Sequence, residues 1–371
     1  MSDIQVIESA DRETLGPFDA IIDVRSPSEF AEDHVPGAIS LPVLNDAERA
    51  EVGTIYVQES RFRARRIGAA LIARNIAGYL EGELAGKPGG FRPLIYCWRG
   101  GQRSGAMATI LSQVGWRTAV LAGGYKTYRR RVRARLYDDD WPLRLVLLEG
   151  RTGSGKTEIL GRLAARGVQV LDLEALAEHR GSVFGGIGRA QPSQKMFESR
   201  LLAALESLDP ERPVVAEAES SKIGDRMLPP GLWKAMTDAP RVAVAAPLGA
   251  RARYLAIHYG DVVADRAAFD AALERLPVYP GRKALATWRA LADAGDLEAL
   301  AADLVGNHYD PAYDRANRKD PRPRLAALEM PGLGAADQEA AADAIVGLLA
   351  QPLLMSGASA AQSRSAPAGR S

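Results

Sequence analysis

Cys97 is the only cysteine among the 371 residues, and it stands where a short apolar segment meets a loop rich in glycine and arginine. The loop reads CWRGGQRS over residues 97–104, and the pattern from Ser104 to Gln113 predicts a helix directly after it. A thiol becomes nucleophilic as its thiolate, which nearby cations and the positive end of a helix favour. Arg99 and Arg103 supply the cations, so the sequence predicts a catalytic cysteine assisted by these two arginines.

Gly100 and Gly101 give the same loop backbone freedom, because glycine adopts positive φ angles without steric cost. Successive N–H groups can then curl inward and form a cradle for an anion bound at the sulfur. The plainer alternative is a buried cysteine that packs as a small hydrophobic side chain. The polarity and charge of the loop favour the reactive interpretation.

A second motif, GRTGSGKT over residues 150–157, fits the pattern G-x-x-x-x-G-K-[ST] of a phosphate-binding loop. It follows a predicted strand and precedes a predicted helix, which is the context that the motif requires. In such a loop, backbone N–H groups point at phosphate oxygens, the lysine reaches the terminal phosphate, and the next hydroxyl can ligate Mg²⁺. The predicted diphosphate-binding residues are Gly150, Gly153, Ser154, Gly155, Lys156 and Thr157, and Lys156 is also predicted to be catalytic.

Carboxylates follow two later strands in this half of the chain. Asp172 and Glu217 each come directly after an apolar segment, and Glu219 lies two residues further on. Ligands of parallel sheets gather beyond the carboxyl ends of the strands, so these side chains can face the phosphate loop. Thr157, Asp172 and Glu217 are therefore the predicted Mg²⁺ ligands, although capping of the next helix is an equal alternative for Asp172.

Two segments are strongly basic and carry aromatic residues, namely residues 61–66 and 126–135. Such segments can follow a phosphate backbone, although many are only solvated helix faces. Under the first interpretation the predicted RNA-binding residues are Arg61, Arg63, Arg129, Arg130 and Arg131.

Composition narrows the class of protein further. The formal net charge is only +1, so the basic segments are local features and not a property of the whole chain. A single cysteine excludes an internal disulfide, and no charged-then-apolar leader opens the sequence, so a reducing cytoplasm is the expected location. No apolar run approaches the length of a membrane span, so no association with a membrane is expected.

Apolar strands alternate with helical stretches along the chain, which favours parallel sheets covered by helices and thus an α/β protein. We expect a first domain over 1–136, a linker over 137–143, a P-loop domain over 144–351 and a disordered tail over 352–371. A loop near His179 either closes over a ligand or merely connects two elements. The predicted strands are 20–24, 93–96 and 118–121 in the first domain and 145–148, 168–171, 214–216 and 242–245 in the second; helices are predicted near 61–80, 104–113, 194–208 and 336–350.

The first domain resembles a rhodanese domain, on the segments DVRSPSEF at 23–30 and HVPGAI at 34–39, the Cys97 loop, and LAGGY at 121–125. Rhodanese domains carry sulfur or selenium on the loop cysteine as a persulfide or perselenide. One departure is Asp33, where the family usually has glycine before the histidine, and we expect it to affect only a turn remote from the sulfur.

Together with the phosphate loop, the segments DLE at 172–174, HRGS at 179–182, QPSQ at 191–194 and EAES at 217–220 make the chain resemble the tRNA 2-selenouridine synthase family over about residues 5–315. The resemblance implies a cytoplasmic transferase for tRNA processing. It would replace the sulfur of wobble 2-thiouridine (position 34) in the tRNAs for lysine, glutamate and glutamine by selenium, through S-geranylation. Geranyl diphosphate and selenophosphate would be co-substrates, with Mg²⁺, and a synthetase would supply the selenophosphate.

Two other functions fit parts of the sequence. One is an ATP-dependent RNA sulfurtransferase or kinase in which the rhodanese domain carries sulfur. The other is a non-catalytic RNA-binding module whose two loops only sense anions, but a structural remnant would need neither the cysteine nor Lys156-Thr157. The sequence does not determine the oligomeric state, and a monomer is the working expectation.

Overall fold

The computed structural model describes residues 4–180, 190–258, 260–276, 280–318 and 320–351. Two compact units make up the chain: Met1–Asp139 with Pro192–Glu206, and Asp140–Gln191 with Ser207–Ser371. Each unit contains a five-stranded sheet in which all neighbouring strands are parallel. The predicted α/β class with two parallel sheets is therefore confirmed. The predicted tail, 352–371, lies outside the described residues.

The sheet of the first unit has the strand order β1-β5-β4-β2-β3. Its interior strand β4 is buried along its whole length, as expected for a parallel strand that is covered on both faces. The loop after β4 carries Cys97. The elements are β1 Gln5–Ile7, α1 Arg12–Leu15, β2 Ala20–Asp23, α2 Pro27–Glu32, β3 Ile39–Ser40, α3 Asp46–Gln58, α4 Arg61–Glu81, β4 Pro93–Tyr96, α5 Gln102–Val114, β5 Ala119–Leu121, α6 Tyr125–Arg133, a π-helical turn Ala134–Asp138, and α9 Gln194–Leu205.

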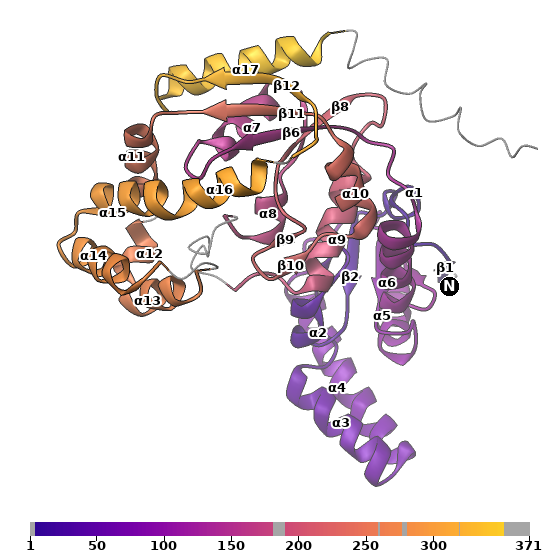
Figure 1. The fold of residues 1–371 in the computed structure, drawn as a ribbon. Coiled ribbons are helices and arrows are strands. Elements are labelled where there is room, and N and C mark those ends of the chain that lie inside the picture. Colours follow the sequence, from indigo (N-terminus) through magenta and orange to yellow (C-terminus); the bar gives the residue numbers. More distant parts are fainter. Residues whose placement is uncertain (1–3, 181–189, 259, 277–279, 319, 352–371) are drawn as a thin grey trace, which may run out of the picture. The chain divides into compact units, whose positions relative to one another are not determined.

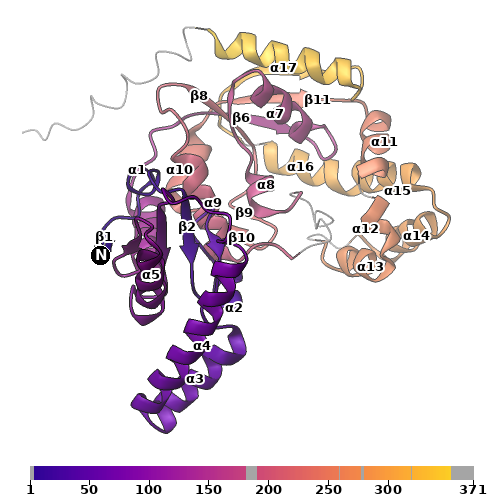
Figure 2. The same cartoon turned by 180° about the vertical axis from the view of Figure 1, so that it is seen from behind.

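Helices α3 and α4 form a hairpin that extends away from the sheet of its unit (Figures 1 and 2). Both helices begin at polar capping side chains. Asn45 accepts a hydrogen bond from the Glu48 N–H (2.8 Å), and Ser60 accepts one from the Arg63 N–H (3.3 Å). These bonds satisfy N–H groups that have no partner within their helix.

Helix α9 packs within the first unit, although its residues follow the phosphate loop in the sequence. Ion pairs and hydrogen bonds join it to α6 and to the π-helical turn that follows α6. Arg129 pairs with Glu198 and Arg131 with Glu206, and the Tyr137 hydroxyl donates to Glu198 (2.8 Å). This part of the chain thus differs from the continuous domains expected along the sequence.

The sheet of the second unit has the order β12-β11-β6-β8-β7, so β6, which leads into the phosphate loop, is central. Helices α7 and α17 pack together over one face and share a hydrophobic core with the sheet (Figure 1). The elements are β6 Arg144–Gly150, α7 Lys156–Ala165, β7 Gln169–Leu171, α8 Leu173–Ala177, β8 Pro213–Glu217, β9 Lys222–Ile223, β10 Arg226–Met227, α10 Pro230–Asp238, β11 Arg241–Ala245, α11 Leu248–His258, α12 Gly260–Ala264, α13 Arg266–Glu274, α14 Arg282–Asp293, α15 Leu297–Leu304, a π-helical turn Val305–Tyr309, α16 Asp310–Asn317, β12 Arg324–Glu329 and α17 Ala335–Leu349.

Within the described part of the chain, no helix has the length and apolar character needed to cross a membrane.

Candidate active sites

The Cys97 thiol lies at the base of a cradle of hydrogen-bond donors. Its Sγ accepts hydrogen bonds from the Gly101 N–H (3.3 Å) and from the Ser104 hydroxyl (3.2 Å). The side chain is 4% exposed, so the thiol is buried but held by polar groups and not only by apolar packing. These contacts belong to the predicted cradle and would stabilise a thiolate.

Two opposing effects set the pKa of Cys97. Burial acts to raise it, but hydrogen bonds from the Ser104 side chain and from the N–H groups of Ser104, Gly101 and Arg99 outweigh burial and leave the pKa below its ordinary value. A lowered pKa increases the fraction of nucleophilic thiolate near neutral pH. The Cys97 environment therefore has the electrostatics of a reactive cysteine.

The two predicted arginine partners have different surroundings. Arg99 is exposed on the loop. Arg103 is largely covered, and its Nη1 lies 2.7 Å from Glu29 Oε2 in an ion pair. The charge of Arg103 is thus partly compensated, which leaves Arg99 as the more available cation for an incoming anion.

Two glycines allow the Cys97 loop and the loop after β5 to approach each other closely. Gly124 has φ +58°, and an added Cβ would lie 2.1 Å from the Cys97 carbonyl oxygen. Gly100 has φ +64°, and its Cβ would lie 2.8 Å from the Leu121 carbonyl oxygen. Both positions require glycine, for its positive φ and for its lack of a side chain. The Tyr125 N–H donates to the Cys97 carbonyl (2.8 Å), so the start of α6 is fixed to the reactive loop.

Asp33 is connected to this loop and is not remote from it, so the sequence expectation was wrong. Its buried carboxylate accepts hydrogen bonds from the Tyr125 hydroxyl and the Ser199 hydroxyl (both 2.7 Å). Because Tyr125 also bonds to the Cys97 backbone, Asp33 links α9 to the reactive loop through one residue. Burial raises the pKa of Asp33, and the two hydroxyl donors act against that rise.

The phosphate loop of the second unit leads from β6 into α7. Lys156 Nζ donates to the Gly150 carbonyl (3.3 Å), which folds the lysine back over the loop. The buried Arg251 guanidinium holds the loop from outside, donating to the Thr152 carbonyl (3.2 Å) while it pairs with Asp310 (2.7 Å). The Ser154 hydroxyl is buried without a hydrogen-bond partner among the described residues. Such a loop is preformed, with N–H groups at a helix start for an anion.

A cavity of about 620 Å³ opens at this loop. Its walls carry side chains of both charges, and three tyrosines also line it, namely Tyr254, Tyr309 and Tyr313. Tyr254 stacks on His258 with ring centroids 4.0 Å apart. The lining residues that could do chemistry or bind phosphate include Ser154, Lys156, Thr157, Glu174, His179, Arg180, Glu219, Tyr254 and His258.

The predicted metal ligands lie in two different places. Thr157 lines the cavity, whereas Asp172 and Glu217 are not among its lining residues. Asp172 accepts the Ala175 N–H (2.7 Å) and Glu217 accepts the Leu173 N–H (3.0 Å), so both carboxylates hold the start of α8. Within the described ranges, no group of three or more His, Cys, Asp or Glu side chains is arranged to hold a metal ion. Thr157 is thus the predicted ligand that fits a metal bound together with a phosphate.

Glu174 and Glu219 form a carboxyl pair beside Lys156 that the sequence analysis did not single out as a unit. Burial, and after it the charge of Glu219, raises the pKa of Glu174 to about 8, and Lys156 acts against the rise. A hydrogen bond between the two carboxyl groups accompanies the shift, so one of them holds a proton near neutral pH. The position of Glu174 two residues after the helix cap Asp172 is the signal that could have identified it.

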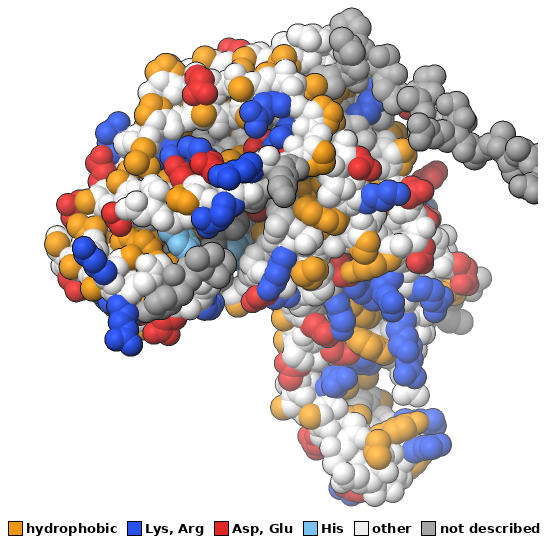
Figure 3. Space-filling model, in the orientation of Figure 1, with side chains coloured by type: hydrophobic (Ala, Val, Ile, Leu, Met, Phe, Trp, Pro, Cys, Tyr) orange, Lys and Arg blue, Asp and Glu red, His pale blue; other side chains and the backbone are white. Residues whose placement is uncertain are grey.

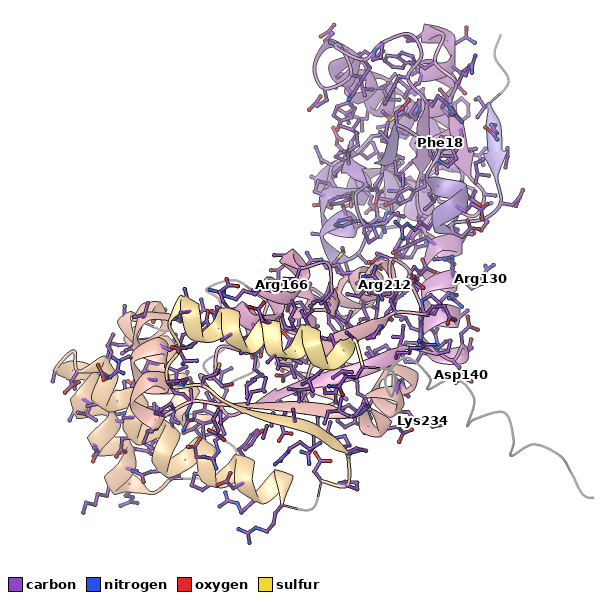
Figure 4. The ribbon with its side chains drawn as sticks, turned by 90° about the horizontal axis from the view of Figure 1, so that it is seen from above. Phe18, Arg130, Asp140, Arg166, Arg212 and Lys234 are labelled. Carbon is purple, nitrogen blue, oxygen red and sulfur yellow. The ribbon has the colours of Figure 1, made fainter. Side chains whose placement is uncertain are left out.

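The five predicted RNA-binding arginines also lie in different surroundings. Arg61 and Arg63 lie in the first turn of α4, where Arg63 pairs with Glu59. Arg129 pairs with Glu198 of α9 and Arg131 with Glu206, the residue that follows α9, whereas Arg130 is exposed. Figure 4 shows the Arg130 side chain extending away from the ribbon.

Comparisons with known proteins match two segments of the chain. Residues 8–131 match the model of the rhodanese-like domain, and residues 143–275 match the model of the tRNA 2-selenouridine synthase AAA domain. The chain thus carries a rhodanese-like domain followed by a domain that matches the AAA domain of tRNA 2-selenouridine synthases. It is similar to tRNA 2-selenouridine synthases of Nitrosomonas europaea (37% identical, covering 62% of this chain and 61% of the relative) and Aeromonas salmonicida (38%, 64% and 64%).

The aligned region spans less than two thirds of the length of these relatives. The activity of the tRNA 2-selenouridine synthases named above is therefore a proposal for this chain. The rhodanese match contains Cys97, and the AAA match contains the phosphate loop together with Glu174 and Glu219.

The carboxyl pair of the AAA domain predicts how stability depends on pH. The folded pKa of Glu174, about 8, exceeds the ordinary value of 4.5, so the folded state keeps a proton that the unfolded chain releases. Stability contributed by this proton is present below about pH 4.5 and is lost as the pH rises to about 8. We expect Glu174→Gln to stabilise the protein at about pH 8 by on the order of 2 kcal/mol, measured by thermal melts across this range.

Glu274→Gln is the matched control, because Glu274 is exposed on α13 in the same unit. It should leave the pH dependence unchanged. A Glu174→Gln curve that is parallel to the wild-type curve would show that Glu174 is ionised like an ordinary surface acid.

Proposed function

We propose that the chain is a transferase that converts wobble 2-thiouridine of the tRNAs for lysine, glutamate and glutamine to 2-selenouridine. The observation that carries this proposal is the Cys97 thiol, whose Sγ accepts two hydrogen bonds and whose pKa is lowered, on a domain of the rhodanese family. Its similarity to tRNA 2-selenouridine synthases supports the choice of selenium and of tRNA.

The AAA domain would perform the first step, in which the sulfur of 2-thiouridine attacks the allylic carbon of geranyl diphosphate. The diphosphate would lie on the loop of Gly150, Gly153, Ser154 and Gly155, where N–H groups and Lys156 stabilise the charge that develops on the leaving diphosphate. Thr157 would hold Mg²⁺, which adds positive charge at the same oxygens when it is bound. The Glu174 and Glu219 carboxyl pair could accept the proton lost from the base.

The rhodanese domain would perform the second step. The Cys97 thiolate would attack the phosphorus of selenophosphate, received by Arg99, which forms an S–P bond, breaks the P–Se bond and releases selenide beside the thiol. The selenide would attack C2 of the S-geranylated base and displace geranylthiolate, which gives 2-selenouridine. Water would then hydrolyse the S–P bond, which releases phosphate and restores the Cys97 thiolate.

The test is nucleoside mass spectrometry of a 2-thiouridine anticodon stem-loop incubated with the protein, Mg²⁺, a thiol and geranyl diphosphate, with and without selenophosphate. The proposal expects a geranyl adduct in the absence of selenophosphate and a sulfur-to-selenium exchange in its presence. If neither product forms while ATP is consumed, the ATP-dependent sulfurtransferase or kinase replaces it.

A further inference from the structure

One face of helix α6 carries a row of cations. Lys126, Arg129, Arg130 and Arg133 are spaced at i, i+3, i+4 and i+7, which places them on the same side of the helix. Lys126, Arg130 and Arg133 are exposed and form no ion pair with any residue that the structure describes. Figure 3 shows Lys and Arg side chains gathered on the part of the first unit formed by α5 and α6.

The other arginines of this segment are compensated within the fold. Arg129 is 16% exposed and pairs with the buried Glu198, and its Nη1 donates to the Lys195 carbonyl (3.2 Å). Arg131 is 20% exposed and pairs with Glu206. The basic run of the sequence thus divides into arginines that attach α9 and cations that face solvent.

A cavity of about 560 Å³ lies along the row of cations and adds aromatic walls to it. Trp98, Tyr125 and Tyr137 line this cavity, and Asp138 is the single acid among its lining residues. Trp98 is partly exposed and stacks on Tyr125, with ring centroids 5.2 Å apart at an interplanar angle of 30°. The cavity therefore combines flat apolar faces with three uncompensated positive charges.

The same surface ends at the reactive loop. Trp98 directly follows Cys97, and the Lys126 N–H donates to the Trp98 carbonyl (3.3 Å). The Tyr125 N–H donates to the Cys97 carbonyl (2.8 Å). A ligand that lies along α6 with one end on Trp98 is consequently brought to the residue that carries the thiol.

We propose that the surface of Lys126, Arg130, Arg133, Trp98 and Tyr137 binds single-stranded RNA, with backbone phosphates along the three cations and a base stacked on Trp98. Single-stranded nucleic acid is the ligand that uses both features, because a charged groove follows its backbone and aromatic rings accept its bases. The inference rests on the proposed function, since it assigns the tRNA substrate to a surface next to Cys97.

The first experiment removes the three exposed charges. We compare K126Q/R130Q/R133Q with a control variant, R74Q/K87Q/R117Q, which removes the same charges from exposed positions elsewhere in the first unit. Binding of a fluorescein-labelled 2-thiouridine anticodon stem-loop is followed by anisotropy across a range of salt concentrations. The α6 variant should bind roughly 10-fold more weakly or worse at low salt, and its log–log salt slope should be about 2 smaller than that of the wild type. The control should bind like the wild type.

The second experiment tests the stacking surface. Trp98→Leu should weaken binding roughly 10-fold, and Trp98→Phe should restore most of the loss, because a phenyl ring still accepts a base. Melting temperatures equal to that of the wild type establish that both variants are folded.

The possible results separate this inference from the proposed function. If the α6 variant binds RNA with wild-type affinity and modifies it normally, the proposed RNA-binding surface is wrong, whereas the proposed function stands. No RNA binding by the wild-type protein overturns the tRNA substrate itself. Poly-glutamate and unlabelled RNA are also compared as competitors at equal concentrations of charge. If poly-glutamate displaces the labelled RNA as well as unlabelled RNA does, the inference is overturned, since an acidic peptide would then fit the surface equally well.

Discussion

Replacing Cys97 by alanine is expected to abolish selenium transfer to 2-thiouridine RNA, while geranylated RNA still forms. In the proposed reaction the nucleophile is the sulfur itself, and no described side chain in its cradle can replace a thiolate, because Ser104 and the loop N–H groups only donate to it. The loss should be at least about 10³-fold, as for other removed nucleophiles. Nucleoside mass spectrometry of the two products measures both reactions in one sample.

Ser104→Ala tests the same site with a smaller expected effect than Cys97→Ala. It keeps the sulfur but removes the hydroxyl that donates to Sγ (3.2 Å), so the pKa of the Cys97 thiol should rise. Selenium transfer should fall by about tenfold near neutral pH and recover at higher pH, because the acid limb of the pH–rate profile moves to higher pH.

The Cys97→Ala variant also tests whether the two reactions are separate. Loss of geranylation in this variant, with an unchanged melting temperature, would contradict a division of the two reactions between the domains.

Most of the fold could be predicted because its strands are short apolar segments bounded by turns. The predicted strands at 20–24, 93–96, 145–148 and 242–245 all correspond to observed strands. β12 was missed because its sequence, RLAALE, contains no β-branched residue and alternates between exposed and half-buried positions. Its pairing with β11 makes it a strand, and that partner is about 80 residues away in the sequence.

The packing of α9 could not be predicted either. Its sequence predicts a helix with a buried face, and the structure shows that helix at Gln194–Leu205. Which unit it packs against depends on pairs such as Arg129 with Glu198 and Ser199 with Asp33, which join residues at least 69 positions apart. A local pattern records the buried face of a helix but not its partner.

The candidate sites divide in the same way. Both reactive loops are contiguous motifs, so their residues could be read directly from the sequence. The Glu174 and Glu219 pair and the Asp33 to Tyr125 bond instead depend on elements that meet only in the folded chain. The sequence favoured Asp172 and Glu217 because they end strands, but in the structure these carboxylates are bonded to the start of α8.

Replacing Lys156 by alanine is expected to remove geranylation first and selenium transfer as its consequence. Lys156 lines the cavity at the phosphate loop, and its ammonium group would stabilise the charge on the departing diphosphate. Removing one preorganised charge of this kind costs roughly 10²- to 10³-fold in rate. The measurement is formation of geranylated RNA from geranyl diphosphate, followed over time by mass spectrometry.

Lys234→Ala is the control for this variant, because Lys234 is exposed on α10 of the same unit and is absent from the lining of the cavity (Figure 4). It should react like the wild type. The sharpest result comes from supplying Lys156→Ala with RNA that has already been geranylated. Selenium transfer should then return to the wild-type rate, because the step on Cys97 no longer depends on the phosphate loop. Unchanged geranylation by Lys156→Ala would mean that the loop serves another ligand, and continued failure on the geranylated RNA would mean that the two reactions share one site.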